Sequence, residues 1–118
     1  MATFRKLNVW QRARQLTRDI YRETRAFPAE EQFGLSAQLR RAAVSIMCNL
    51  AEGCARSGRR DQLRLLNIAY ASAAETECLL VAAGDQAILA ETSSAELIAA
   101  AIEIQRMLAG LMRALRAP

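Results

Sequence analysis

The chain has 118 residues, enough for one domain with a single core. Hydrophobic residues make up 53% of it, and only two prolines and five glycines interrupt it, which indicates helices. It contains no histidine, so the commonest general base and the commonest metal ligand are both missing. The N-terminus lacks the apolar run of about 7–15 residues found in signal peptides, and no stretch approaches the roughly 20 residues that span a bilayer. We therefore expect a cytoplasmic protein with no membrane partner.

The net charge of +4 is unevenly distributed. Residues 1–64 carry 13 Arg or Lys against 6 Asp or Glu, whereas residues 65–118 carry 3 against 6. This asymmetry is typical of a nucleic-acid-binding surface, and equally of complementary surfaces within a bundle or between subunits.

The first helix is predicted over residues 8–26. Apolar residues recur there at steps of three and four, which places them on one face, and Asn8 is a plausible cap. Pro28 ends the helix, because proline has no backbone N–H and restricts the residue before it. The opposite, solvated face carries Arg14, Arg18, Arg22 and Arg25.

Two further helices are predicted over residues 36–56 and 59–83. The pair Ser57-Gly58 separates them, and Gly84-Asp85 indicates a stop after the second. Cys48, Cys54 and Cys78 fall inside these helices without a CxxC pair, so we expect small buried thiols.

The fourth helix is predicted over residues 94–115. Ser93 and Glu96 have the spacing of a capping box, in which each side chain bonds the other's backbone N–H. An apolar stripe with heptad spacing follows at Leu97, Ala101, Ile104, Leu108, Leu111 and Leu115. Four helices joined by short loops predict an all-α fold, an antiparallel up-down-up-down four-helix bundle that forms one domain over residues 1–118.

The third and fourth helices are apolar around more than one stripe. Ile98, Ile102 and Met112 lie beside the main stripe, where a lone bundle would expose them. Self-association is the simplest way to cover these groups, and the alternative is apolar surface that water tolerates.

A polar line follows the second helix at steps of three and four: Gln38, Arg41, Ser45, Asn49 and Glu52. In an antiparallel pair of helices it faces residues of the third helix, so that Arg41 lies near Glu75, Gln38 near Glu77, Ser45 near Ser72, and Asn49 near Asn67. Serine and asparagine compete with helical backbone bonds, so a hydrogen-bonded network that fixes helix register or a subunit contact would explain them. A binding site and an ordinary solvated face are the alternatives.

A longer pattern spans about residues 7–80. It comprises Val9-Trp10, Tyr21, Phe27-Pro28, Glu31, Phe33-Gly34-Leu35, Gln38-Leu39-Arg40-Arg41-Ala42, Ser45-Ile46, Asn49-Leu50-Ala51-Glu52-Gly53, Ile68-Ala69, Ser72 and Glu75. This pattern resembles the 23S rRNA intervening-sequence proteins. The resemblance implies a four-helix bundle that assembles into a ring, typically a homopentamer. A distant relative of that family, the accessory variability protein of diversity-generating retroelements, associates with reverse transcriptase and RNA, so RNA is a possible partner by analogy.

No catalytic, cofactor-binding or metal site is expected, and no small-molecule substrate. The chain has no Gly-rich phosphate loop and no nucleophile with a nearby base. Two functions stay open: a non-catalytic oligomeric scaffold or interaction module, and an RNA-binding accessory protein. The RNA-binding function is suggested by arginine, which supplies 15 of the 16 basic residues. Arginine binds phosphate in a bidentate manner better than lysine does. The candidate nucleic-acid residues are Arg56, Arg59, Arg60 and Arg64 at one bundle end, with Arg14, Arg18 and Arg22 on the first helix; no aromatic platform interleaves them.

Overall fold

The computed structural model describes residues 3–118, and in that part of the chain all regular structure is helical. Its four long helices are α1 (Asn8–Thr24), α2 (Leu35–Ala55), α3 (Arg59–Asp85) and α4 (Glu91–Arg116). Two short 3-10 helices, η1 (Phe4–Lys6) and η2 (Ala29–Glu31), precede α1 and α2.

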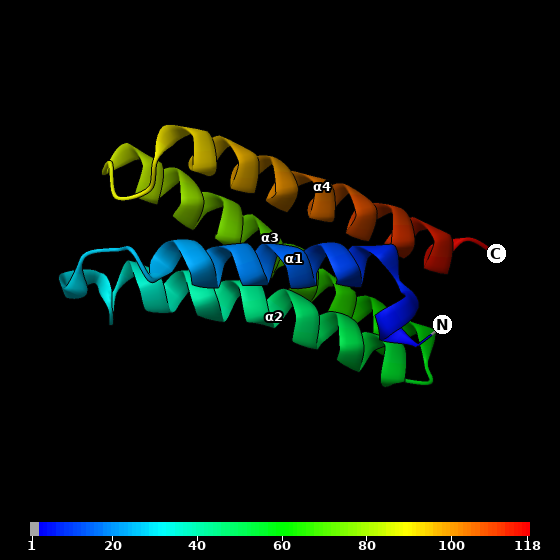
Figure 1. The fold of residues 1–118 in the computed structure, drawn as a ribbon. Helices are drawn as coiled ribbons and strands as arrows, with labels where there is room; N and C mark the ends of the chain where they lie inside the picture. The colour runs from blue at the N-terminus through cyan, green and yellow to red at the C-terminus, as the bar shows by residue number, and fades with distance from the viewer. Residues whose placement is uncertain (1–2) are drawn as a thin grey trace.

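The helices form an antiparallel four-helix bundle (Figure 1). Helix α1 packs against α2 and α4, and α3 packs against the same two helices. Consecutive helices run in opposite directions, so the predicted up-down-up-down topology is confirmed. Both chain termini lie at the end that holds the α2–α3 turn, and the α1–α2 and α3–α4 connections lie at the other end (Figure 1).

The core consists mainly of aliphatic side chains from all four helices, with Trp10 and Phe27 as its buried aromatic residues. The largest fully buried ones are Leu16, Ile20, Leu39, Ile46, Leu50, Leu66, Leu80, Ile104 and Leu108. Buried alanines occur on all four helices, among them Ala13 on α1, Ala43 on α2, Ala73 on α3 and Ala101 on α4. On α4 the stripe ends at Met112, which is buried, while Leu111 and Leu115 are half-buried. Met112 therefore belongs to the core, although sequence periodicity places it among the apolar residues that a lone bundle would expose.

The predicted helix ends differ from the observed ones where a cap was expected. Leu7, not Asn8, is the N-cap of α1, and no side chain caps that end. Helix α4 begins at Glu91 with Ala90 as its N-cap, so the capping box predicted from Ser93 and Glu96 does not form. Helix α4 starts earlier than predicted and takes Ser94 into its first turn, where the side chain is buried.

The α3–α4 connection is built differently from the predicted glycine stop. Helix α3 continues through Gly84 to Asp85, and Ala87 adopts the left-handed conformation with φ of 56°. Gly84 serves a different purpose, because a Cβ atom there would lie 2.7 Å from Ser94 Oγ. Its missing side chain lets α3 and α4 approach closely at this end.

The cysteine prediction is wrong for two of the three thiols. Cys48 and Cys78 are exposed, and only Cys54 is partly buried. Burial raises the pKa of the Cys54 thiol above its ordinary value.

Helix α3 is long and apolar enough to cross a membrane by length and composition alone. Core helices of bundles meet the same test, and the inner stripe of α3 is packed against α2 and α4. Only 39% of its most apolar 18-residue stretch is buried, however. A single copy of the bundle thus leaves much apolar surface of α3 uncovered.

Candidate functional site

The polar line between α2 and α3 contains one direct bridge between the two helices. The hydroxyl oxygens of Ser45 and Ser72 lie 2.8 Å apart. Asn49 Nδ2 donates to Ser45 Oγ at 3.0 Å and to the Ser45 carbonyl at 2.9 Å. The structure therefore brings Ser45 and Ser72 together as predicted, while Asn49 bonds within its own helix and not to Asn67.

The other members of the polar line are less connected. Gln38, Arg41, Ser45 and Glu75 line one hollow of about 290 Å³, but Arg41 and Glu75 form no ion pair in the part of the chain that the structure describes. Glu52 is exposed.

The predicted pair of Gln38 and Glu77 does not form. Glu77 instead accepts a hydrogen bond from Gln105 Nε2 on α4 at 2.8 Å. Residues two apart on a helix point in different directions, so Glu75 faces α2 while Glu77 faces α4.

We expect Ser45→Ala to lower the free energy of unfolding by about 1–3 kcal/mol, because the buried Ser72 hydroxyl loses its partner on α2. The double variant Ser45→Ala/Ser72→Ala should cost less than the sum of the two single changes. Urea unfolding of the four proteins measures this coupling. Combining Ser45→Ala with Thr92→Ala, an exposed position on α4, should be additive within about 0.5 kcal/mol; the same additivity for Ser45 and Ser72 would refute the bridge.

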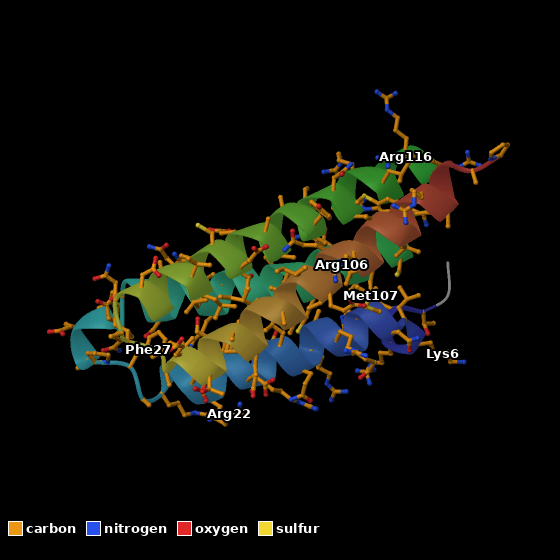
Figure 2. All side chains as sticks on the ribbon, turned by 90° about the horizontal axis from the view of Figure 1, so that it is seen from above. Lys6, Arg22, Phe27, Arg106, Met107 and Arg116 are labelled. Atoms are coloured by element: carbon orange, nitrogen blue, oxygen red, sulfur yellow. The ribbon has the colours of Figure 1, made fainter. Side chains whose placement is uncertain are left out.

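The arginines of α1 lie on its outer side, where Figure 2 shows Arg22 pointing into solvent. Arg22 is partly neutralised, with Nη1 3.0 Å from Asp19 Oδ1 and Nε 3.4 Å from Glu23 Oε2. The Arg14 guanidinium lies 5.7 Å from the centroid of the Trp10 ring. Arg18 is exposed.

At the α2–α3 turn, some arginines are paired with a carboxylate and others are not. Asp61 pairs with Arg56 at 3.4 Å and with Arg64 at 2.9 Å, whereas Arg59 and Arg60 are exposed and have no ion pair within residues 3–118. Buried Gln62 holds the turn, because its Nε2 donates to the Arg56 carbonyl at 2.8 Å.

The fold adds basic residues to this end of the bundle that sequence reasoning missed. Lys6 and Arg116 come from opposite ends of the chain, and both lie at the end that holds the α2–α3 turn (Figure 2). Arg5 and Arg113 lie close to them in sequence and are also exposed. These residues could have been predicted from the topology, because an up-down-up-down bundle places both chain termini at the same end as the turn between its second and third helices. We call this basic end the turn end; its residues are Arg5, Lys6, Arg56, Arg59, Arg60, Arg64, Arg113 and Arg116.

A second feature that sequence reasoning missed lies at the opposite end, in the α1–α2 connection. Phe33 is 88% exposed and lines a hollow of about 610 Å³ together with Arg25, Arg40 and Arg41. An exposed aromatic side chain therefore shares a hollow with three arginines, none of which is among the seven candidate nucleic-acid residues named from the sequence. Phe27, which Figure 2 labels at this end, is by contrast buried.

Apolar side chains remain on the surface around the Glu77–Gln105 hydrogen bond. Tyr70 is 38% and Val81 42% exposed, and Ile98 and Ile102 are half-buried. On α3, Tyr70 and Val81 lie seven and four residues from Glu77, and on α4, Ile98 and Ile102 lie seven and three residues from Gln105. These spacings place all four side chains on the same helix faces as Glu77 and Gln105, which are hydrogen-bonded to each other. Val81 and Ile98 also line one hollow. We call Tyr70, Val81, Ile98 and Ile102 the α3/α4 face.

Within residues 3–118, no three Cys, Asp or Glu side chains are grouped as a metal-binding cluster.

Known structures share this fold. A crystal structure of a protein of unknown function from the S23 ribosomal protein family of Bacteroides thetaiotaomicron superposes with a TM-score of 0.80 at 23% sequence identity. The match covers 89% of this chain and 98% of that one, and at this identity it shows the fold alone. No curated protein matches the chain.

The sequence itself matches a family model. The model describes the 23S rRNA-intervening sequence protein, and it aligns with residues 5–110, which include all of α1, α2 and α3 and most of α4. A match over this much of the sequence, together with the four-helix fold, agrees with the resemblance carried by the pattern of α1 to α3. The chain belongs to the 23S rRNA-intervening sequence protein family.

Proposed function

We propose that the protein is a non-catalytic scaffold that works as a self-associated ring, with five copies as the expected number. The observation that carries this proposal is the uncovered apolar surface of α3 and α4. Of the twenty residues from Leu65 to Gly84, only Glu75 and Glu77 are charged. A helix facing water normally carries charge on its outer side, so this one is typical of a buried element.

The outward residues of α3 support the same proposal. Asn67, Ala71, Ala74 and Cys78 are exposed and small or uncharged, which allows a neighbouring helix to approach closely. The α3/α4 face supplies larger apolar groups beside them. Burial of apolar surface yields about 25 cal/mol per Å², so contact between copies would stabilise the assembly.

The charge distribution favours a ring. A ring requires that one face of each copy contacts a different face of the next copy. Residues 1–64 are strongly basic and residues 65–118 are acidic, so contact between unlike faces brings opposite charges together. Contact between like faces would place like charges opposite one another.

The absence of catalysis is part of the proposal. The chain has no histidine, and the hydrogen-bonded group at Ser45, Asn49 and Ser72 contains only neutral side chains. Sedimentation velocity tests the proposed self-association: the scaffold predicts one species heavier than a 13.0 kDa chain, and a single-chain species would contradict it.

A second function, nucleic-acid binding, is favoured by the turn end. Arg59 and Arg60 keep their guanidinium groups free of carboxylates within residues 3–118, and the chain termini add further cations beside them. Arginine binds phosphate in a bidentate manner, and a ring would present this end several times.

We expect Arg59→Glu/Arg60→Glu to weaken binding of a labelled RNA at least tenfold and to lower the dependence of log Kd on log salt by roughly 1.4, as for two lost phosphate contacts with a single strand. Fluorescence anisotropy over a salt series measures both. Arg22→Glu/Arg106→Glu makes the same change in net charge away from the turn end, near the C-terminal end of α1 and in the middle of α4 (Figure 2). Equal losses in the two double variants would show that net charge alone, and not the turn end, attracts the RNA.

A further inference from the structure

We infer that the hollow beside the α1–α2 connection binds one unpaired nucleotide of a single-stranded nucleic acid, with its base on Phe33 and its phosphate on Arg25, Arg40 and Arg41. We call this hollow the Phe33 pocket. The inference rests on the nucleic-acid function proposed above and names a site for it at the bundle end opposite the turn end.

The first observation is the charge of the Phe33 pocket. Its lining contains three arginines and no Asp or Glu. Glu31, which precedes Gln32 and Phe33 in the sequence, uses Oε1 to accept a hydrogen bond from the Leu35 backbone N–H at 3.3 Å. None of the three arginines forms an ion pair within residues 3–118. The pocket is therefore an uncompensated cationic site, which favours an anionic ligand.

The second observation is that Arg40 is held in place before any ligand arrives. Its Nε donates to Thr24 Oγ1 at 2.8 Å, and its guanidinium lies 4.6 Å from the centroid of the Tyr21 ring. Thr24 is buried and bonds the Ile20 carbonyl at 2.7 Å, which fixes the acceptor itself. The Nη1 group of Arg40 takes part in none of the hydrogen bonds of residues 3–118. A guanidinium held in this way loses little conformational entropy when it binds phosphate.

The third observation is the exposure of Phe33. A phenylalanine that is 88% exposed contributes almost nothing to the core, and three of the residues that line the Phe33 pocket with it are arginines. Stacking of a base on an exposed aromatic ring is worth about 1–3 kcal/mol, and it tolerates any base because every base has a π-face. An aromatic ring beside phosphate-binding arginines is the combination that single-stranded nucleic-acid sites use.

Size and chemistry favour a nucleotide over an acidic peptide. The Phe33 pocket measures about 610 Å³, within the range of roughly 300–1,000 Å³ that holds one small ligand. Carboxylates of a peptide would satisfy the arginines but would leave the Phe33 ring without a planar partner. A base and its phosphate satisfy both.

Binding is measured with oligouridine and oligothymidine of ten nucleotides, each carrying a fluorophore, and with the full-length protein in low salt. We expect Phe33→Ala to weaken binding of both strands by roughly 5- to 140-fold, the loss that corresponds to one stacked base. Phe33→Leu keeps an apolar side chain but removes the ring, and it should lose as much affinity as Phe33→Ala. Phe33→Trp should retain or improve binding. Arg25→Ala/Arg41→Ala should weaken binding and lower the salt dependence.

Three results would overturn the inference. Wild-type affinity in Phe33→Leu would show that the site recognises apolar contact and not a base. Displacement of the oligonucleotide by oligoglutamate at equal charge concentration would indicate an acidic peptide as the ligand. A change of assembly mass in Phe33→Ala would identify Phe33 as a contact between copies.

The same titrations separate this inference from the function on which it rests. Failure of the wild-type protein to bind either oligonucleotide would reject nucleic-acid binding altogether. Binding that is weakened by Arg59→Glu/Arg60→Glu but not by the Phe33 variants would keep that function and reject the Phe33 pocket as its site.

Discussion

Replacing Val81 and Ile98 with glutamate is expected to convert the assembled protein into single chains of 13.0 kDa. Both residues belong to the α3/α4 face and line the same hollow between the two helices. Two carboxylates per copy would have to be buried in the contact, and desolvation of an unpaired charge costs several kcal/mol. That cost exceeds what a few apolar side chains at a subunit contact contribute. Light scattering of the variant measures the mass.

The control for this prediction adds the same charge elsewhere. Gln32→Glu/Gln86→Glu changes the net charge by the same amount at exposed positions in the α1–α2 and α3–α4 connections, outside the α3/α4 face. It should keep the mass of the wild-type assembly, and circular dichroism should show that both variants stay helical. Dissociation of the control as well, or an unchanged mass of Val81→Glu/Ile98→Glu, would mean that the α3/α4 face does not hold the copies together.

Gly84→Ala is expected to destabilise the bundle by about 1–3 kcal/mol, a decrease in Tm of roughly 4–12 °C. The new methyl group would lie 2.7 Å from Ser94 Oγ and 3.3 Å from Ser94 Cβ. Ser94 is buried, so its side chain has little room to move, and α4 would have to shift away from α3. Thermal unfolding followed by circular dichroism measures the change.

Gly110→Ala is the matched control, because Gly110 also lies inside a helix. The only atom near its added Cβ is Arg113 Nη2, at 3.8 Å. Alanine is the better helix former, so this variant should gain about 0.5–1 kcal/mol. If Gly84→Ala were also stabilising, the close approach of α3 and α4 at Gly84 would be refuted.

The fold was predictable because each helix repeats its apolar residues over many turns. Leu16, Ile20, Ile46, Leu50, Ile104 and Leu108 are all buried where periodicity places them. Helix ends depend on capping and on local packing, and the periodicity of apolar residues does not predict either. Serines before an apolar run indicate a cap at Ser93, but α4 begins at Glu91, and the buried Ser94 hydroxyl donates to the Leu80 carbonyl of α3 at 3.4 Å.

The candidate sites were only partly predictable. Antiparallel register is enough to pair Ser45 with Ser72, because both lie at the middle of their helices. It does not specify where a long side chain ends, so Glu77 bonds Gln105 on α4 and not Gln38 on α2. Asp61 similarly neutralises Arg56 and Arg64, while Arg59 and Arg60 stay free of carboxylates within residues 3–118. The Phe33 pocket combines residues of α1, a loop and α2, and only the folded chain brings them together.

The proposed ring requires that other copies of the chain cover the apolar surface of α3 and α4. Light scattering of the wild-type protein over a hundredfold dilution tests it most directly. We expect a mass that is a whole multiple of 13.0 kDa, with five as the expected multiple, and that persists at micromolar concentration. A monodisperse 13.0 kDa species at every concentration would show that other copies do not cover this surface.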